Sequence, residues 1–256
     1  MLRFFGNRRA TKFEAPIGVA RRTYAVGDVH GRIDLLTQLI AEIERDARTA
    51  QETPELIFMG DYIDRGEESG AVIDFLVAMA ARDDFDTVFL MGNHERMMLD
   101  FLLVPEMGAR WLRYGGLQTL MSYGLSTQGS VNEAGVLEKI QANLLQKLGP
   151  RREFIEQMTL SHISGNVLFV HAAANPGRPP DSQSDECLLW GHPRFFDQTR
   201  QDGVWVVHGH TVVTEPSAEQ GRIAVDTGAY FSNRLTAARL DAGQVSFLAA
   251  STPGAG

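Results

Sequence analysis

The sequence is poor in cysteine, has no long apolar run and carries fewer positive than negative charges. Its single cysteine, Cys187, cannot form an internal disulfide and belongs to no CxxC motif for metal binding or redox chemistry. No apolar run approaches the roughly 18 residues that indicate a membrane span, and the N-terminus lacks the apolar segment of a secretory signal. These absences favour a cytoplasmic protein without a membrane partner.

The charge balance also limits the possible partners. A formal net charge of -8 and a pI near 5.4 argue against a nucleic-acid partner, because affinity for nucleic acid depends largely on Lys and Arg that neutralise phosphates. With 256 residues, 44% of them hydrophobic, the chain is long enough for one sizeable α/β domain. We expect this domain at residues 22–250, after a flexible basic arm at 1–21 and before a loose tail at 251–256.

Three common catalytic motifs are missing as well. The sequence has no GxxxxGK[ST] loop for nucleotide phosphates and no GxSxG turn for a nucleophilic serine. After Cys187 the next arginine is Arg194, and the phosphatase loop with a cysteine nucleophile needs an arginine six positions on. Any hydrolytic chemistry therefore has to come from other groups.

Three times in its first half, the sequence does contain an apolar run followed by a polar turn with glycine and then by a helical period. The expected strands are 22–26, 55–59 and 87–91, the turns are GDVHG (27–31), GDYIDRG (60–66) and GNHE (92–95), and the expected helices are 35–47, 71–81 and 96–103. This alternation predicts a parallel sheet, in which ligands bind beyond the carboxyl ends of the strands. Asp28, Asp61 and Asn93 should therefore meet at one edge.

The rest of the chain predicts a second sheet. Residues 104–165 are expected to form a mostly helical insertion over the site. Short apolar strands with little helix between them follow, at 167–170, 204–207, 222–225, 235–240 and 245–248. We therefore expect an α/β fold of two packed mixed β-sheets flanked by helices, with a helical insertion.

Imidazole and oxygen ligands gather at the predicted strand ends. They are His30, His94, His171 and His210 together with Asp28, Asp61, Asp64 and Asn93. A single histidine in a core is more often structural than a ligand. The whole set, however, suits two divalent cations such as manganese, iron or zinc.

In their order, these motifs resemble one known family. GDVHG, GDYIDRG, GNHE, a later strand-end histidine and a final GHT are similar to the phosphoprotein phosphatases among the calcineurin-like metallophosphoesterases, over about residues 22–240. Four further segments look more like the small bacterial serine/threonine phosphatase branch than the eukaryotic catalytic subunits: WLRYGG (111–116), TLMSYG (119–124), DTGA (226–229) and RLTA (234–237). The resemblance implies a sandwich of two sheets and a phosphohydrolase with two divalent metal ions, of which manganese is the first choice.

The resemblance also implies a role for each ligand. Asp28 and His30 would hold the first metal, Asp61 would bridge both, and Asn93, His171 and His210 would complete the second. A bridging carboxylate can hold two cations about 3.5–4 Å apart, where a hydroxide between them can attack phosphorus.

The same comparison assigns catalytic and substrate-binding residues. His94 is implied as the acid that protonates the leaving oxygen, with Asp64 orienting its ring, and Arg65 as a planar clamp on the phosphoryl oxygens. Relatives commonly have a second arginine clamp shortly after the Trp of a segment such as LLWGHPRF (188–195). This chain has His192 there and Arg194 two residues later, and either could serve.

Substrate choice is the part that the sequence leaves most open. The resemblance favours a serine/threonine protein phosphatase acting on a phosphorylated protein. The alternative is a small phosphorylated substrate, cleaved by a symmetrical bis(5'-nucleosyl)-tetraphosphatase activity on the same core. A remote alternative is an inactive metal-binding scaffold, against which the presence of both His94 and Asp64 argues.

Overall fold

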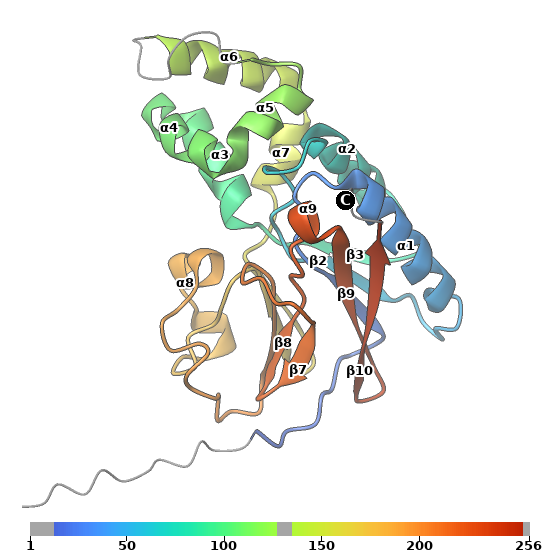
Figure 1. Cartoon of the computed structure of the whole chain (residues 1–256). Helices are drawn as coiled ribbons and strands as arrows, with labels where there is room; N and C mark the ends of the chain where they lie inside the picture. The colour runs from blue at the N-terminus through green and yellow to red at the C-terminus, as the bar shows by residue number, and fades with distance from the viewer. Residues whose placement is uncertain (1–12, 127–134, 253–256) are drawn as a thin grey trace, which may run out of the picture.

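The computed structural model describes residues 13–126 and 135–252, which form two five-stranded β-sheets packed face to face and flanked by helices (Figure 1). The first sheet has the strand order β10-β9-β1-β2-β3. Its strands are β1 (Thr23–Val26), β2 (Glu55–Phe58), β3 (Asp86–Phe89), β9 (Arg234–Asp241) and β10 (Gln244–Ser251). β1, β2 and β3 are parallel, and β9 and β10 are antiparallel neighbours.

The second sheet has the order β4-β5-β6-β8-β7. Its strands are β4 (Ser161–Ser164), β5 (Val167–Val170), β6 (Trp205–His208), β7 (Ser217–Glu219) and β8 (Arg222–Ala224). β5, β6 and β8 are parallel, with an antiparallel strand at each edge. Both sheets are therefore mixed, and the predicted α/β fold of two packed sheets is confirmed.

Helices cover the outer faces of the two sheets (Figure 1). Two of them, α1 (Ile33–Ala47) and α2 (Ser69–Ala80), connect parallel strands of the first sheet, and α8 (Asp185–Trp190) packs on the second. Others gather beside the first sheet: α3 (Asn93–Leu103), α4 (Gly108–Trp111), a π-helical turn (Leu112–Gly116), α5 (Leu117–Ser122), α6 (Val136–Leu148) and α7 (Arg151–Glu156). The remaining short elements are 3₁₀ turns at Pro105–Met107 and Pro180–Ser182 and the one-turn helix α9 (Ala229–Ser232).

The core explains why the central strands read as continuous apolar runs. Alternate residues of a strand point to opposite faces, and both faces of these sheets are covered. In β1, Tyr24 and Val26 pack with the helices, whereas Ala25 packs between the sheets. Ala25 lies opposite Ala238 of β9, and both are fully buried in the layer between the sheets. Two small side chains at this point let the sheets approach closely.

Glu55 connects the two sheets by hydrogen bonds. Its carboxylate accepts from Thr23 Oγ1 at 3.0 Å within the first sheet, and from Ser164 Oγ at 2.6 Å and His162 Nε2 at 3.0 Å on β4 of the second. Burial alone would raise the pKa of Glu55, but these hydrogen bonds outweigh it and lower the pKa to about 2.

Some predicted boundaries differ from those observed. The helices of the expected insertion at 104–165 end at Glu156, and Ser161–Ser164 form β4, whose sequence SHIS contains too few apolar residues to predict a strand. Part of the expected arm at 1–21 packs on the body: Ile17 is buried, and Trp205 Nε1 donates to Ala15 O at 2.9 Å. Residues 1–12 lie outside the described part of the chain.

The first two residues of the tail expected at 251–256 are not loose. Ser251 belongs to β10, and the N–H of Thr252 donates to Asn233 O at 3.1 Å, while residues 253–256 lie outside the described part. None of the described helices is long and apolar enough to cross a membrane.

Candidate metal centre

The polar turns of both sheets meet at the carboxyl ends of parallel strands. Asp28, Asp61 and Asn93 follow β1, β2 and β3, while His171 and His210 follow β5 and β6. Backbone hydrogen bonds join neighbouring turns: His30 N donates to Asp61 O at 2.9 Å, and Gly209 N donates to His171 O at 2.8 Å. The two sheets thus contribute to one cluster of possible metal ligands, most of them buried.

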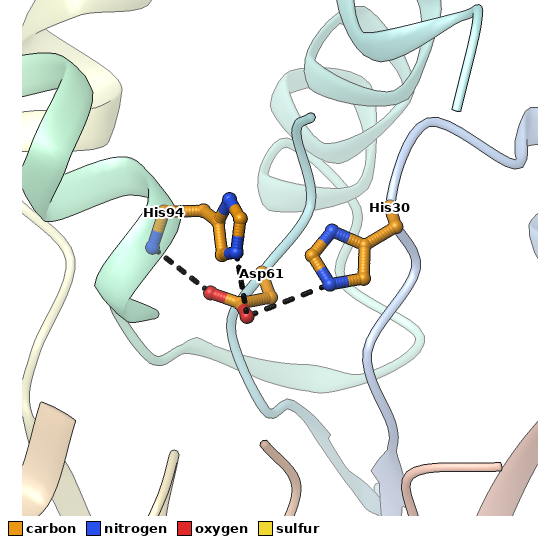
Figure 2. Close-up of side chains that lie close together, drawn as sticks. All are labelled: His30, Asp61 and His94. Atoms are coloured by element: carbon orange, nitrogen blue, oxygen red, sulfur yellow. Dashed lines mark hydrogen bonds and ion pairs between the residues drawn. The ribbon is translucent and has the colours of Figure 1, made fainter. Parts of the chain in front are cut away.

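Asp61 lies at the middle of this cluster, between His30 and His94 (Figure 2). Its Oδ2 lies 3.6 Å from His30 Nε2 and 3.9 Å from His94 Nε2. His30 donates its Nδ1–H to Ile63 O at 2.8 Å, so its Nε2 presents a lone pair to the cluster. Burial lowers the pKa of His30 to about 3, which keeps the ring neutral and able to bind a metal.

Asp61 also belongs to a second group, with His171 and His210. His171 Nε2 lies 3.4 Å from Asp61 Oδ1 and 3.0 Å from Asn93 Oδ1, and His210 Nδ1 lies 2.9 Å from the same Asn93 oxygen. His171 already donates its Nδ1–H to Met59 O at 2.9 Å. Its Nε2 can therefore face two oxygens favourably only with a cation between them, either a proton or a metal ion.

The pKa of His171 also indicates that a positive charge is favoured at this position. Burial lowers this pKa, but the negative charge of Asp61 outweighs burial and raises it to about 10. Burial lowers the pKa of His210 to about 4, which keeps that ring neutral and able to bind a metal. The donor set, with Asp61 shared by two groups, fits a pair of divalent cations.

Asp28 completes the negative part of the cluster. Its carboxylate accepts the N–H of His210 at 3.0 Å, and Asp226 lies close enough that burial and the Asp226 charge together raise the pKa of Asp28 well above its ordinary value. Buried carboxylates that repel one another are stabilised by a bound cation. The sequence analysis gave Asp226 no role, although the strand-end turn DTGA signalled it.

The site is built on strained backbone. Among the described residues, eight that are not glycine have a positive φ, and five of these are predicted site residues: His30 (45°), Asp61 (53°), Asp64 (71°), Arg65 (67°) and His210 (60°). Such conformations cost on the order of 1–3 kcal/mol each and concentrate at functional sites. Gly60, at φ 98°, is required as glycine, since a Cβ there would lie 2.6 Å from Gly92 N.

Asp64 holds the ring of His94 in a buried network. Its Oδ2 accepts the Nδ1–H of His94 at 2.7 Å, and both side chains are fully buried. Asp64 also accepts Trp111 Nε1–H at 2.9 Å and the Thr119 hydroxyl at 2.6 Å. The pKa of His94 is lowered by burial but raised more by Asp61 and Asp64, to above its ordinary value. His94 Nε2 is thereby aimed at the cluster.

Trp111 and Thr119 are further residues that the sequence analysis did not assign. They lie in the segments WLRYGG and TLMSYG, which marked the resemblance but suggested no contact with Asp64. Glu95, the last residue of GNHE, was also missed. Its carboxylate accepts the backbone N–H groups of Asp61 at 2.9 Å, Tyr62 at 2.8 Å and Gly92 at 2.9 Å, and so ties two of the turns together.

Arg65 covers the cluster from the solvent side. One guanidinium nitrogen lies 3.0 Å from His30 Nε2, and the other lies 3.0 Å from His94 Nε2. The backbone N–H of Arg65 donates to Gly115 O at 3.3 Å. Gly115 has φ 119°, and a Cβ there would lie 2.7 Å from Arg65 N, so this glycine lets the two loops approach.

The two candidates for a second phosphate clamp lie in a separate loop. Arg194 is exposed and contacts Asn175 Oδ1 at 3.4 Å, and its backbone N–H donates to His192 Nδ1 at 3.3 Å. Within the described residues, neither side chain has a hydrogen bond or ion pair with the metal-ligand cluster. The buried His208 packs against the rings of Phe195 and Phe196.

Comparisons with known proteins agree with this geometry. Residues 21–214 match the family model described as calcineurin-like phosphoesterase. A curated protein from Oceanobacillus iheyensis, named bis(5'-nucleosyl)-tetraphosphatase PrpE [asymmetrical], is 28% identical over 238 residues, which cover 84% of this chain and 86% of that protein.

Two solved structures show a similar fold. One is assigned as a diadenosine tetraphosphatase, with a TM-score of 0.59, 16% identity and coverage of 94% of this chain and 100% of that chain. The other is a protein serine/threonine phosphatase from Saccharomyces cerevisiae, with a TM-score of 0.53, 16% identity and coverage of 91% and 81%. At these identities the likeness concerns the fold alone.

Proposed function

Since the chain belongs to the calcineurin-like phosphoesterase family, we propose that it is a metal-dependent phosphohydrolase whose substrate is a dinucleoside tetraphosphate. The observation that carries the proposal is the position of Asp61, which two groups of possible metal ligands share. The substrate is supported by the curated relative, which matches most of both chains. The order expected from the sequence, with a phosphorylated protein first, is therefore reversed.

The position of cleavage also differs from the alternative considered at first. The sequence analysis named symmetrical hydrolysis, whereas the relative is named as asymmetrical. We therefore expect one nucleoside triphosphate and one nucleoside monophosphate as products, rather than two diphosphates.

The cluster supports the metal ligands expected from the sequence. Asp28 and His30 would hold one cation, Asn93, His171 and His210 the other, and Asp61 both. Mixed carboxylate, amide and imidazole ligands suit manganese, with iron or zinc as alternatives. When bound, two such cations would supply Lewis acidity at the phosphoryl oxygens and lower the pKa of water.

The remaining residues would bind the phosphate and transfer a proton. Arg65 would donate its paired N–H groups to the phosphoryl oxygens, for which it has to leave His30 and His94. His94 would give the proton on Nε2 to the leaving oxygen, while Asp64 accepts Nδ1–H and stabilises the charged ring. Trp111 and Thr119 would keep the Asp64 carboxylate in place.

A direct comparison of substrates tests the proposal. With Mn²⁺ present, we expect a higher kcat/KM for diadenosine tetraphosphate than for a phosphoserine or phosphothreonine peptide, with ATP and AMP as products. An Asp61→Asn variant serves as the control, since loss of its turnover shows that the activity belongs to this site. Faster turnover of the peptide would overturn the proposed substrate, and two ADP would overturn the proposed position of cleavage. No turnover of either substrate with Mn²⁺, Fe²⁺ or Zn²⁺ would favour the inactive scaffold.

A further inference from the structure

We propose that Tyr230 and Phe231 form an aromatic platform on which one nucleobase of the substrate stacks. This inference rests on the proposed function, because it assigns a recognition element for a dinucleotide. The two residues lie on α9, beside β9 (Figure 1). No motif in the sequence analysis pointed to either of them.

Both rings are accessible to solvent. Tyr230 is 37% exposed and Phe231 is 57% exposed, and their centroids are 4.9 Å apart with an interplanar angle of 76°. Scattered exposed apolar residues are common on protein surfaces, but an adjacent pair at the rim of a charged site is suited to a ligand with a flat apolar part. A nucleobase is such a ligand, since each base has a π-face.

The platform lies next to the proposed phosphate-binding residue Arg65. The Tyr230 ring lies 5.4 Å from the His30 ring, nearly perpendicular to it, and Arg65 Cζ lies 5.0 Å from the Tyr230 centroid. Tyr230 therefore already has partners in the site, whereas Phe231 is more exposed and farther along the same turn. A nucleotide whose phosphate binds Arg65 would place its sugar beside Tyr230 and its base on Phe231.

The platform is held in place before any ligand binds. Arg32 donates to Ala229 O at 2.9 Å and to Asn233 Oδ1 at 2.8 Å, so it ties both ends of α9. At Gly228, which has φ 71°, a Cβ would lie 2.4 Å from the Phe231 ring, so the ring lies directly over this glycine. A surface ordered in advance loses little entropy on binding, which favours affinity.

The experiment compares a substrate that has bases with one that has none. For wild type and each variant, kcat/KM is measured with diadenosine tetraphosphate and with inorganic tetraphosphate, and the ratio of the two is the readout. Any damage that a variant does to the phosphate site affects both substrates and cancels in the ratio. A second readout, the inhibition constant of AMP relative to that of inorganic phosphate, needs no turnover of a base-free substrate.

We expect Phe231→Ala to lower two preferences: that for diadenosine tetraphosphate over inorganic tetraphosphate, and that for AMP over inorganic phosphate. Each should fall by about 5- to 150-fold, the range for loss of one stacked base. Tyr230→Ala should lower them in the same direction, and Phe231→Tyr should retain them because the ring remains. Phe196→Ala is the matched control, since Phe196 is 51% exposed but packs on Phe195 and His208 instead. Its preferences should equal those of the wild type.

The possible failures are distinguishable. If the wild type prefers the dinucleotide and Phe231→Ala keeps that preference in both readouts, the platform is wrong and the proposed function stands. If the wild type does not turn over the dinucleotide, or turns over a phosphopeptide faster, the proposed function is wrong. The proposed base-stacking role of Tyr230 and Phe231 is then wrong as well.

Discussion

Replacing Asp64 by Asn tests the proposed proton transfer most directly. This carboxylate is not one of the proposed metal ligands, but it holds the His94 ring through one fully buried hydrogen bond of 2.7 Å. The substitution keeps the size of the side chain and removes its charge. If His94 is the acid, removing the charge of Asp64 should reduce kcat only through its effect on the His94 ring.

The magnitude follows from the contact. A hydrogen bond to a charged group contributes about 1.5–3 kcal/mol, so the loss in kcat should be about 10- to 150-fold for Asp64→Asn. Removing the acid itself in His94→Asn should reduce kcat by about 10²- to 10⁴-fold. Because Asp64 would act only through His94, the double variant should be no slower than His94→Asn.

The assay uses two aryl phosphates at saturating Mn²⁺. Phenolate is a poor leaving group that needs a proton, whereas 4-nitrophenolate leaves more readily without one. Both single variants should therefore lose more activity with phenyl phosphate than with 4-nitrophenyl phosphate. Asp100→Asn is a matched control, since Asp100 is on the same helix as His94 (α3) but forms an ion pair with Arg96 at 3.2 Å. Thermal melting of each variant separates a folding defect from a catalytic one.

Two results would refute this reasoning. The first is an equal loss with both leaving groups, which would show that His94 does not protonate the leaving oxygen. The second is a double variant whose loss equals the product of the single losses, which would show that Asp64 acts independently of His94.

Three further predictions concern stability, metal and phosphate binding. The low pKa of Glu55, about 2, means that its carboxylate stabilises the fold by about 3 kcal/mol above pH 4.5, and that this contribution disappears as the pH falls towards 2. Urea unfolding of Glu55→Gln should therefore depend less on pH between 4.5 and 2 than that of the wild type, and an identical dependence would contradict the assignment. Chelation should abolish turnover and lower the melting temperature, because metal at 100 times its Kd stabilises the fold by about 2.7 kcal/mol; full activity after the metal content has been shown to fall to zero would exclude the metal centre. Arg65→Lys should reduce kcat/KM by about 10- to 150-fold, since lysine lacks the paired N–H groups, and wild-type kinetics would remove Arg65 from phosphate binding.

The sequence was most informative where a buried strand ends in a polar turn. An apolar run places its strand in a sheet, and parallel strands bring their carboxyl ends to one edge, so Asp28, Asp61 and Asn93 could be expected to meet without knowledge of distances. The two histidines after β5 and β6 follow the same rule. The meeting of these turns could be predicted because strand periodicity determines where they lie, whereas the metal-ligand role expected of each residue came from the resemblance to the phosphatase family.

Residues that act through long-range contacts could not be found in this way. Trp111 and Thr119 are 47 and 55 positions from Asp64 and lie in helical segments with no feature that marks a partner. Asp226 resembles any acid in a turn until the fold places it beside Asp28. The strand β4 was missed because, as an edge strand with polar positions, it lacks an apolar run.

The alanine pair between the sheets has a consequence for catalysis. Since one sheet carries Asp28 and Asp61 and the other carries His171 and His210, the thickness of the layer around Ala25 and Ala238 sets how far apart the two halves of the centre lie. A larger side chain at either position would push the two sheets apart without contacting a proposed metal ligand. Catalytic rate should thus be sensitive to core volume, and a search for activity-altering substitutions would recover positions remote from the chemistry.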